Sequence, residues 1–277
     1  NLVLKAHLDI NAINLLRTYV NYLVQIKINF SNHVIFKVFT SYPEFCQKAF
    51  QYFTNRFHPE KFCQSDSELN ELYNILDGIS NPEHDLILRR FLSSLKATLR
   101  TNFYKANCDY ISLKFNCRKI DGIPLPKPLY EIFVFSSRMQ GIHCRGGKVS
   151  RGGIRWSDRL ADFRTEILGL MKAQMVKNSI IVPLGSKGGF ICTNPNPTRE
   201  DAVLAYKTLI RGILDITDNI LPDNSIAKSG ICYDDEDPYL VVAADKGTAT
   251  FYDIANEISK EYNFWLGDAF ASGGSAG

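Results

Sequence analysis

The sequence has little that would place the protein in a membrane or on nucleic acid. Its longest apolar runs, residues 180–184 and 239–244, are far shorter than the roughly 20 residues that a membrane-spanning helix needs. The 32 Lys and Arg residues nearly balance the 29 Asp and Glu residues, and no basic run is long enough to indicate a nucleic-acid partner. We therefore expect a soluble protein whose partners are neither membranes nor nucleic acids.

Three other signals are missing. The seven cysteines form no C-x-x-C pair and no cluster with histidine at zinc-site spacing, which is typical of a protein from a reducing compartment without a metal site. No secretory signal precedes the first helix-like segment, and the chain begins with Asn1 rather than Met. No G-x-G-x-x-G fingerprint of a dinucleotide-binding unit occurs anywhere. We expect a cytoplasmic, internal piece of a longer protein.

Residues 1–104 are predicted to form a helical region. Apolar residues between Ile13 and Val24 recur at intervals of three and four, which places them on one helix face. The pattern Ser-x-x-Glu at residues 65–68 predicts a capping box. Asn81 followed by Pro82 predicts the start of another helix, which the apolar spacing extends through Leu99.

Residues 105–277 are predicted to form an α/β domain. Alternating apolar and polar residues at 110–117 predict a half-buried strand, and a second strand is expected at 130–136 with a third near 142–144. Farther along, predicted helices and strands alternate, which favours an α/β architecture. The helices are expected at 162–178, 198–220 and 248–262, and the strands at 179–183 and 239–244.

Residues 145–155 are rich in both positively charged residues and glycine. Four cations and four glycines occur within eleven residues, a combination that suits an anionic ligand. The same composition is also typical of a solvated loop whose glycines adopt positive φ. The helix that follows carries Lys172, Gln174 and Lys177, which adds further polar groups to this part of the chain.

Two residues are candidates for acid–base chemistry. Lys187 lies between glycines just after the predicted strand 179–183, where α/β proteins usually place ligand-facing groups. Burial near other cations would suit it to proton transfer near neutral pH, although a turn lysine pointing into water is the alternative. Asp245 follows the strand 239–244 and could simply cap the next helix. Across a pocket from Lys187 it would instead complete an acid–base pair.

Five segments together resemble the large NAD-specific glutamate dehydrogenases of bacteria. They are residues 145–159, 162–178, 182–189, 240–249 and 264–277. The close match covers residues 130–277, whereas the helical region is similar only in general character. By this resemblance, Arg151 with Gly152 and Gly153 binds a substrate carboxylate, and Gln174 and Lys177 hold the other end of the substrate. Arg151 stands where the smaller enzymes of the family have Lys. The resemblance also implies that Lys187 and Asp245 are the catalytic residues.

The resemblance implies the substrate-binding α/β domain of an amino-acid dehydrogenase. The implied reaction is oxidative deamination of L-glutamate to 2-oxoglutarate and ammonia with NAD, in an enzyme that forms a homo-oligomer when complete. NAD would be bound mainly by a Rossmann domain missing from this chain, so we expect the isolated chain to be inactive.

Three alternatives stay open at this point. One is a non-catalytic dicarboxylate-binding module, and another is the inactive remnant of a truncated gene. A leucine or phenylalanine dehydrogenase is the third, but it would need an apolar side-chain pocket where Arg151 instead offers a partner for a carboxylate.

Overall fold

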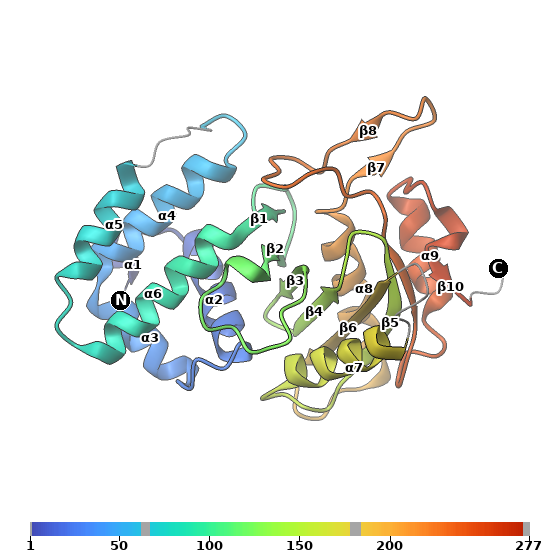
Figure 1. The fold of residues 1–277 in the computed structure, drawn as a ribbon, viewed down its shortest axis with the longest axis horizontal. Coiled ribbons are helices and arrows are strands. Elements are labelled where there is room, and N and C mark those ends of the chain that lie inside the picture. The colour runs from blue at the N-terminus through green and yellow to red at the C-terminus, as the bar shows by residue number, and fades with distance from the viewer. Residues whose placement is uncertain (1, 62–66, 178–183, 274–277) are drawn as a thin grey trace. The chain divides into compact units, whose positions relative to one another are not determined.

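The computed structural model describes residues 2–61, 67–177 and 184–273, apart from the side chains of residues 176 and 177. The chain divides into two compact units, whose elements are labelled in Figure 1. The first unit comprises Asn1–Thr98 and Lys119–Pro124, and the second comprises Leu99–Arg118 and Leu125–Gly277. Within the described part of the chain, no helix is long and apolar enough to span a bilayer.

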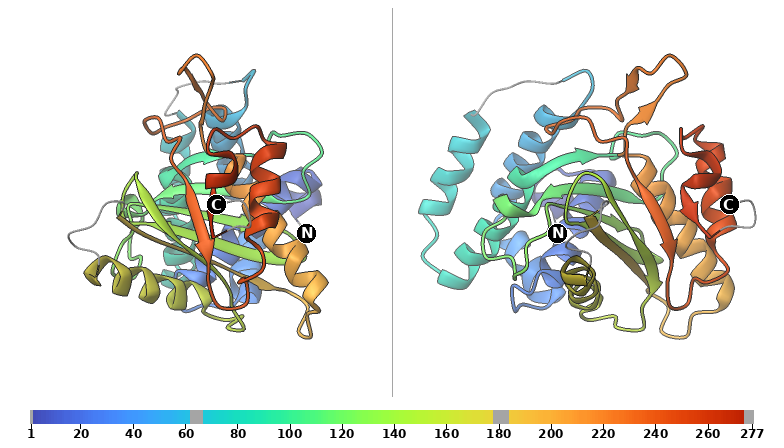
Figure 2. Two further views of the ribbon diagram at one scale, coloured as in Figure 1. Left: turned by 90° about the vertical axis from the view of Figure 1, so that its right-hand side faces the viewer. Right: turned by 45° about the vertical axis from the view of Figure 1, so that its right-hand side comes forward.

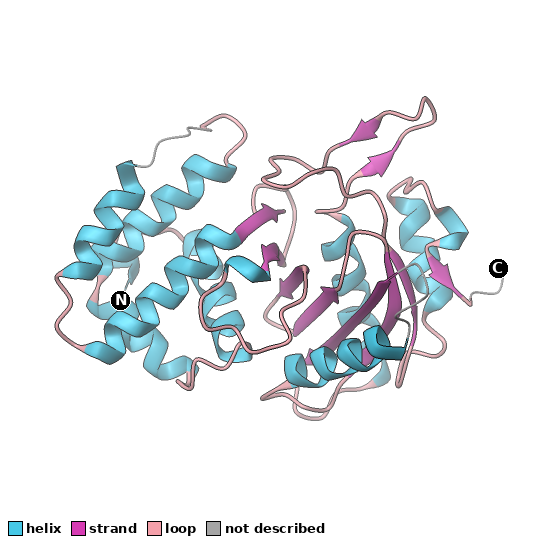
Figure 3. Ribbon diagram, viewed as in Figure 1, coloured by secondary structure: helices cyan, strands magenta, loops and turns pink. Residues whose placement is uncertain are grey.

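The first unit is built from helices (Figure 3). Its core centres on the ring of Phe91, which is met edge-on by Tyr19, Phe39 and Phe45 at centroid distances of 5.3, 5.0 and 6.0 Å. These three rings come from different helices, so one aromatic cluster joins four of them. The helices are α1 (Leu2–Lys5), α2 (Ile10–Gln25), α3 (Asn32–Ser41), α4 (Pro43–Phe57), α5 (Ser67–Asp77) and α6 (Pro82–Ala97).

The predicted start of α6 is confirmed and its predicted end is wrong. The side chain of Asn81 accepts hydrogen bonds from the amides of Glu83 and His84, and Pro82 occupies the first turn. The helix ends at Ala97 because the next four residues form a strand, β1 (Thr98–Thr101). The capping box expected at residues 65–68 begins outside the described residues.

The second unit is organised around an eight-stranded mixed sheet in the order β1-β2-β3-β4-β6-β5-β9-β10. Neighbours from β2 to β6 run antiparallel, whereas β5 is parallel to both β6 and β9, and β10 is parallel to β9. The further strands are β2 (Ile111–Asn116), β3 (Tyr130–Phe135), β4 (Met139–Arg145), β5 (Ser150–Trp156), β6 (Leu184–Cys192), β9 (Val241–Ala244) and β10 (Ala271–Ser272), with a separate hairpin of β7 (Asn219–Ile220) and β8 (Ile226–Ala227). Short 3-10 helices, η1 (Cys117–Lys119) and η2 (Gly267–Ala269), complete the elements together with three α-helices.

Those helices, α7 (Phe163–Lys177), α8 (Arg199–Leu214) and α9 (Tyr252–Glu261), pack on the sheet (Figure 2). A side chain at Gly189 of β6 would collide with Ile167 of α7, and one at Gly141 of β4 would collide with Leu209 of α8. Side chains alternate between the faces of a sheet, so these glycines mark opposite faces. The helices α7 and α8 therefore cover different sides of β4 and β6.

The start of α7 is fixed to the sheet by a buried ion pair. Arg164 donates from Nε and Nη2 to the two carboxylate oxygens of Glu131 on β3, at 2.9 and 2.8 Å. Both side chains are almost completely buried, at 1% and 0% exposure. A bidentate pair of this kind fixes orientation as well as distance, so it sets how α7 lies over its face of the sheet.

The mixed α/β fold class is confirmed, but several element boundaries differ from the expectations. The glycine-rich segment 145–155 is largely strand rather than loop, and Lys187 lies within β6 rather than after a strand. The strand expected at 179–183 lies outside the described residues. The helix expected at 198–220 ends at Leu214, and the one expected from residue 248 begins at Tyr252.

Candidate active site

One face of the sheet, the face beneath α7, brings the candidate residues together. Arg151 and Arg155 of β5 pair in parallel register with Gly185 and Gly189 of β6. Residues two apart on a strand share a face, so Lys187, between these glycines, points the same way as the two arginines. The sequence motifs that stand 36 residues apart at positions 151 and 187 are therefore neighbours on adjacent strands.

Lys187 and Asp245 form a direct ion pair. The Lys187 ammonium lies 2.6 Å from Oδ2 of Asp245, and each side chain is 16% exposed. Asp245 directly follows β9, which pairs with the other edge of β5, so the carboxylate reaches Lys187 across β5. The structure thus brings together the two residues that the sequence nominated as catalytic.

Arg155 is a second partner of the same carboxylate. Its Nε lies 3.2 Å from Oδ2 of Asp245, and its Nη2 lies 3.3 Å from Oδ1. The third nitrogen of the guanidinium donates to Glu166 of α7 at 2.8 Å. The second oxygen of Glu166 accepts a hydrogen bond of 2.6 Å from the Ser157 hydroxyl. Positive and negative groups therefore alternate along one connected row from Lys187 to Glu166.

These contacts keep Asp245 ionised. Burial by itself would raise the pKa of this carboxyl group, but hydrogen bonds from Arg155, Lys187 and the Lys246 amide outweigh burial and lower the pKa to about 2. The backbone amide of Asp245 donates in turn to the Thr248 hydroxyl, which donates to the carbonyl of Ile154 on β5. Both the charge and the position of Asp245 are therefore fixed before any substrate arrives.

Two glycines of β5 make room for this arrangement. A Cβ on Gly152 would lie 1.6 Å from the backbone oxygen of Ser186, so any side chain there would displace β6 beside Lys187. A Cβ on Gly153 would lie 2.7 Å from the Ala244 oxygen and 3.1 Å from Cβ of Asp245. Neither glycine has the positive φ of a loop conformation. Close approach of neighbouring strands explains both glycines, rather than backbone freedom in a solvated loop.

The proposed substrate-binding residues border the same face. Arg151 is exposed, and its carbonyl oxygen accepts a hydrogen bond of 3.0 Å from the side-chain amide of Gln174 on α7. Gln174 thereby joins the covering helix to the strand that carries Arg151. Lys177 is the last residue of α7, and its side chain lies outside the described residues.

The other face of the sheet holds a different set of polar groups. His143 is completely buried there, and burial together with the Arg145 charge lowers its pKa to about 3. A neutral, buried imidazole on the face away from Lys187 has no contact with the candidate site. Across the residues with a described structure, no three His, Cys, Asp or Glu side chains are grouped to hold a metal ion.

Arg155 and Glu166 are the members of the site that the sequence did not nominate. A signal for Arg155 exists, because it stands two residues after Gly153 and four after Arg151, the spacing of one strand face. That signal becomes visible only when the segment is recognised as a strand. Glu166 has no comparable signal, since its contact depends on how α7 folds back over β5.

Comparisons with known proteins identify relatives along the whole chain. The family model described as bacterial NAD-glutamate dehydrogenase, catalytic domain, matches residues 71–277, and the model described as glutamate dehydrogenase, helical motif 3, matches residues 1–59. NAD-specific glutamate dehydrogenases from Halomonas elongata and Pseudomonas aeruginosa are each 47% identical to this chain, over 291 and 295 residues. The relative of the same name from Mycobacterium tuberculosis is 45% identical over 306 residues.

Each of these three relatives aligns with 100% of this chain, which spans only 18% of the relative's own length. The similarity is therefore wider than the sequence motifs indicated, because it includes the helical region as well as residues 130–277. A family model that matches residues 71–277 covers most of the chain and all of the candidate site. This chain belongs to the family of bacterial NAD-glutamate dehydrogenase catalytic domains.

Proposed function

We propose that this chain provides the substrate-binding and acid–base part of an NAD-dependent glutamate dehydrogenase. The observation that carries the proposal is the ion pair between Lys187 and Asp245 on the face of the sheet that also bears Arg151. The names of the relatives support NAD-dependent oxidation of glutamate as the reaction. Because the chain spans only 18% of the length of those relatives, we infer the reaction from their names.

The charges required by the substrate agree with the residues at this face. Glutamate and 2-oxoglutarate each carry two carboxylates, so a selective site needs two cations that are separated from each other. Arg151 would bind one carboxylate, because a guanidinium can make two parallel hydrogen bonds to it. Lys177, with Gln174 one helical turn before it, would hold the other. Gly152 and Gly153 would support the site by letting β6 and β9 approach β5 closely enough to bring Lys187 and Asp245 beside Arg151.

NAD, when bound, accepts the hydride that leaves Cα of glutamate. The sequence has no dinucleotide fingerprint, and we assign no NAD-binding residue to this chain. The steps that this chain would perform are proton transfers. Hydride loss converts the amine to an iminium, which water attacks to form a carbinolamine, and this intermediate collapses to 2-oxoglutarate and ammonia.

Lys187 would position the water that attacks the iminium, and the proton that this water loses would leave to the solvent, as the net reaction requires. Lys187 would then donate a hydrogen bond to the carbinolamine oxygen, where negative charge develops. When Lys187 turns toward the substrate, one of the contacts that lower the pKa of Asp245 is lost. The carboxylate would then accept a proton from the substrate ammonium and return one to the departing amine. The 2.6 Å contact between the two groups gives a direct path for a proton to pass from one to the other. Arg155 would hold the carboxylate in place whenever Lys187 turns toward the substrate.

Calorimetric titration of the purified chain with 2-oxoglutarate tests this proposal. Saturable binding is expected, with affinity about tenfold or more weaker in Arg151→Ala and Lys177→Ala, because each removes a charged partner of a carboxylate. Lys172→Ala is the matched control, since Lys172 is an exposed lysine of the same helix. Equal affinity in all four proteins, or no binding by a chain that unfolds cooperatively, would contradict the proposal.

A further inference from the structure

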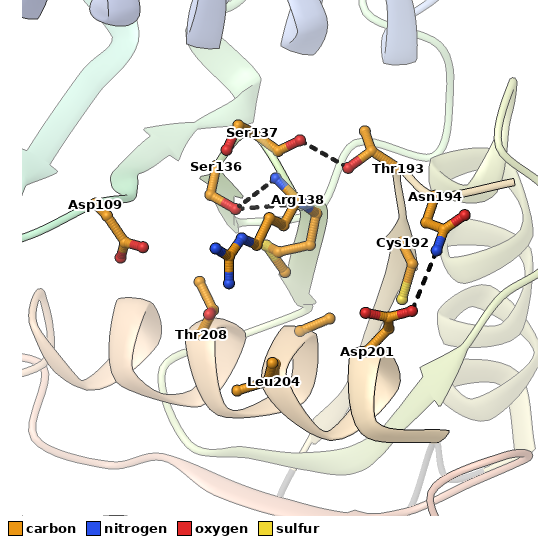
Figure 4. A pocket seen from close by; sticks show the side chains of 12 residues that line it. Asp109, Ser136, Ser137, Arg138, Cys192, Thr193, Asn194, Asp201, Leu204 and Thr208 are labelled. Atoms are coloured by element: carbon orange, nitrogen blue, oxygen red, sulfur yellow. Dashed lines mark hydrogen bonds between the residues drawn. The ribbon is translucent and has the colours of Figure 1, made fainter. Parts of the chain in front are cut away.

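A pocket lies on the opposite side of the sheet from Lys187. It has a volume of about 490 Å³ and is bordered by the turn between β3 and β4, the end of β6 and the first half of α8 (Figure 4). Cys192 of β6 and Met139 of β4, which pair with each other, form its floor. Cys192 is five residues from Lys187 and therefore faces the other way. This pocket is separate from the candidate active site.

The walls of the pocket are fixed by hydrogen bonds within the protein. The Ser136 hydroxyl accepts hydrogen bonds from the amides of Arg138 and Met139, both at 3.2 Å, which closes the turn. Thr193 holds the same turn, because its amide donates to the Arg138 carbonyl at 2.9 Å and its hydroxyl donates to the Ser137 carbonyl at 2.8 Å. The pocket is therefore preformed, so a ligand would not have to order it on binding.

The opposite wall is the beginning of α8. Asp201 accepts hydrogen bonds from the Thr198 amide at 2.9 Å and from the Asn194 side chain at 3.2 Å, as part of a capping box. Through these hydrogen bonds the Asp201 carboxylate caps the N-terminus of α8. The adjacent turn of α8 adds the exposed side chain of Leu204 and the hydroxyl of Thr208 to the pocket.

Two charges of opposite sign remain. The Arg138 guanidinium lies between Ser136 and Thr208, with Asp109 to one side (Figure 4). Both side chains are exposed, and among the described residues neither has an ion pair or a side-chain hydrogen bond, although the Arg138 charge helps to lower the pKa of Asp201. Ser136 is buried and accepts both of its bonds, so its own hydroxyl proton stays available to an acceptor in the pocket.

We propose that this pocket binds a small amino acid, with its carboxylate on Arg138 and the Ser136 hydroxyl and its ammonium group on Asp109. The Arg138 guanidinium can make two parallel hydrogen bonds to the ligand carboxylate, so this contact is expected to be stronger than the one between the ligand ammonium and Asp109. The side chains of Met139 and Leu204 contact the aliphatic part of the ligand. A volume near 490 Å³ is within the range of small-molecule sites and admits a five-carbon amino acid.

Calorimetry on the 277-residue chain tests the proposal with four related probes. L-Norvaline and 5-aminopentanoate carry both charges at two different separations, pentanoate lacks the amine, and butylamine lacks the carboxylate. At least one of the two amino acids is expected to bind about tenfold or more tightly than both single-charge probes. This comparison uses the unaltered protein and does not depend on the folding of a variant.

Variants locate the binding. Arg138→Gln and Asp109→Asn are each expected to weaken amino-acid binding about tenfold or more, whereas Arg118→Gln, an exposed arginine outside the pocket, leaves it unchanged. Lys187→Ala is also expected to leave it unchanged, which separates this site from the proposed active site. Three results would overturn the proposal: affinity equal to that of pentanoate or butylamine, full affinity in Arg138→Gln, or loss of binding in Lys187→Ala.

Discussion

Replacing Arg155 with glutamine is expected to disconnect the two carboxylates of the proposed active site. Arg155 donates to both oxygens of Asp245 and also to Glu166, and its side chain is only 19% exposed. Glutamine removes the positive charge and cannot span both carboxylates. Lys187 then stays as the remaining cation in contact with Asp245.

The size of the effect follows from the pKa of Asp245. Burial acts to raise it, yet the hydrogen bonds hold it at about 2 instead of the ordinary 3.8. Hydrogen bonds to a charged group contribute about 1.5–3 kcal/mol, which corresponds to roughly one to two pH units in a pKa. We therefore expect the pKa of Asp245 to rise to about 3 to 4 in Arg155→Gln.

The lowered pKa of Asp245 also determines how the free energy of unfolding depends on pH. The folded-state pKa of Asp245 is depressed, so its ionised form stabilises the native protein above about pH 4, and this contribution disappears as the pH falls toward 2. The difference between 3.8 and about 2 corresponds to roughly 2 kcal/mol. Most of that contribution is expected to be absent from Arg155→Gln.

A pH titration of the Asp245 carboxyl carbon by NMR measures this directly, with Asp245→Asn to assign the signal. Arg159→Gln is the matched control, because Arg159 pairs with Asp162 and does not contact Asp245. A pKa of Asp245 that stays at about 2 in Arg155→Gln, or that moves equally in both variants, would refute the electrostatic account of the site.

Four further substitutions test strand packing, a buried ion pair and a helix cap. Gly152→Ala is expected to destabilise the chain by about 1–3 kcal/mol in thermal unfolding, because its Cβ would strike a backbone oxygen of β6. Gly169→Ala, with open space around its Cβ on α7, should instead be neutral or stabilising by up to about 1 kcal/mol. Glu131→Gln should cost about 3–5 kcal/mol in urea unfolding by leaving Arg164 buried without its charged partner, and a cost below about 1 kcal/mol would contradict that assignment. Asn81→Ala removes the cap of α6 and should lower the free energy of unfolding by about 1 kcal/mol, so an unchanged midpoint would show that the cap contributes nothing.

Local signals in the sequence were sufficient where a helix or strand depends on its own residues. The cap at Asn81 is an example, because the side chain satisfies amides only two and three residues away. The alternation around Leu113 likewise predicted β2, but the expected half-burial is wrong, because Ser112 and Lys114 on the polar face are buried as well. Lys187 was expected just after a strand and lies within β6 instead, yet its side chain does meet that of Asp245, the other residue that the resemblance nominated as catalytic.

The glycine-rich strand β5 shows why other elements could not be predicted. Its glycines carry no apolar side chains, so they give no alternation, and their purpose is to let β6 and β9 approach closely. That requirement exists only in the folded sheet. The row from Asp245 through Arg155 to Glu166 depends in the same way on folding, because Asp245 is 90 residues from Arg155 and Glu166 reaches Arg155 from the helix that follows β5. Long-range packing of this kind leaves no periodic signal within a single segment.

We propose that the face of the sheet beneath α7 binds the dicarboxylate substrate beside Lys187. The most direct measurement is an amide NMR titration of the labelled chain with 2-oxoglutarate, comparing the unaltered protein with Arg151→Ala. Saturable shifts are expected at Gly153, Gln174 and Lys187, and they should be much weaker in the variant. Shifts confined to the α8 side of the sheet, or shifts at these residues that persist unchanged in Arg151→Ala, would contradict the proposal.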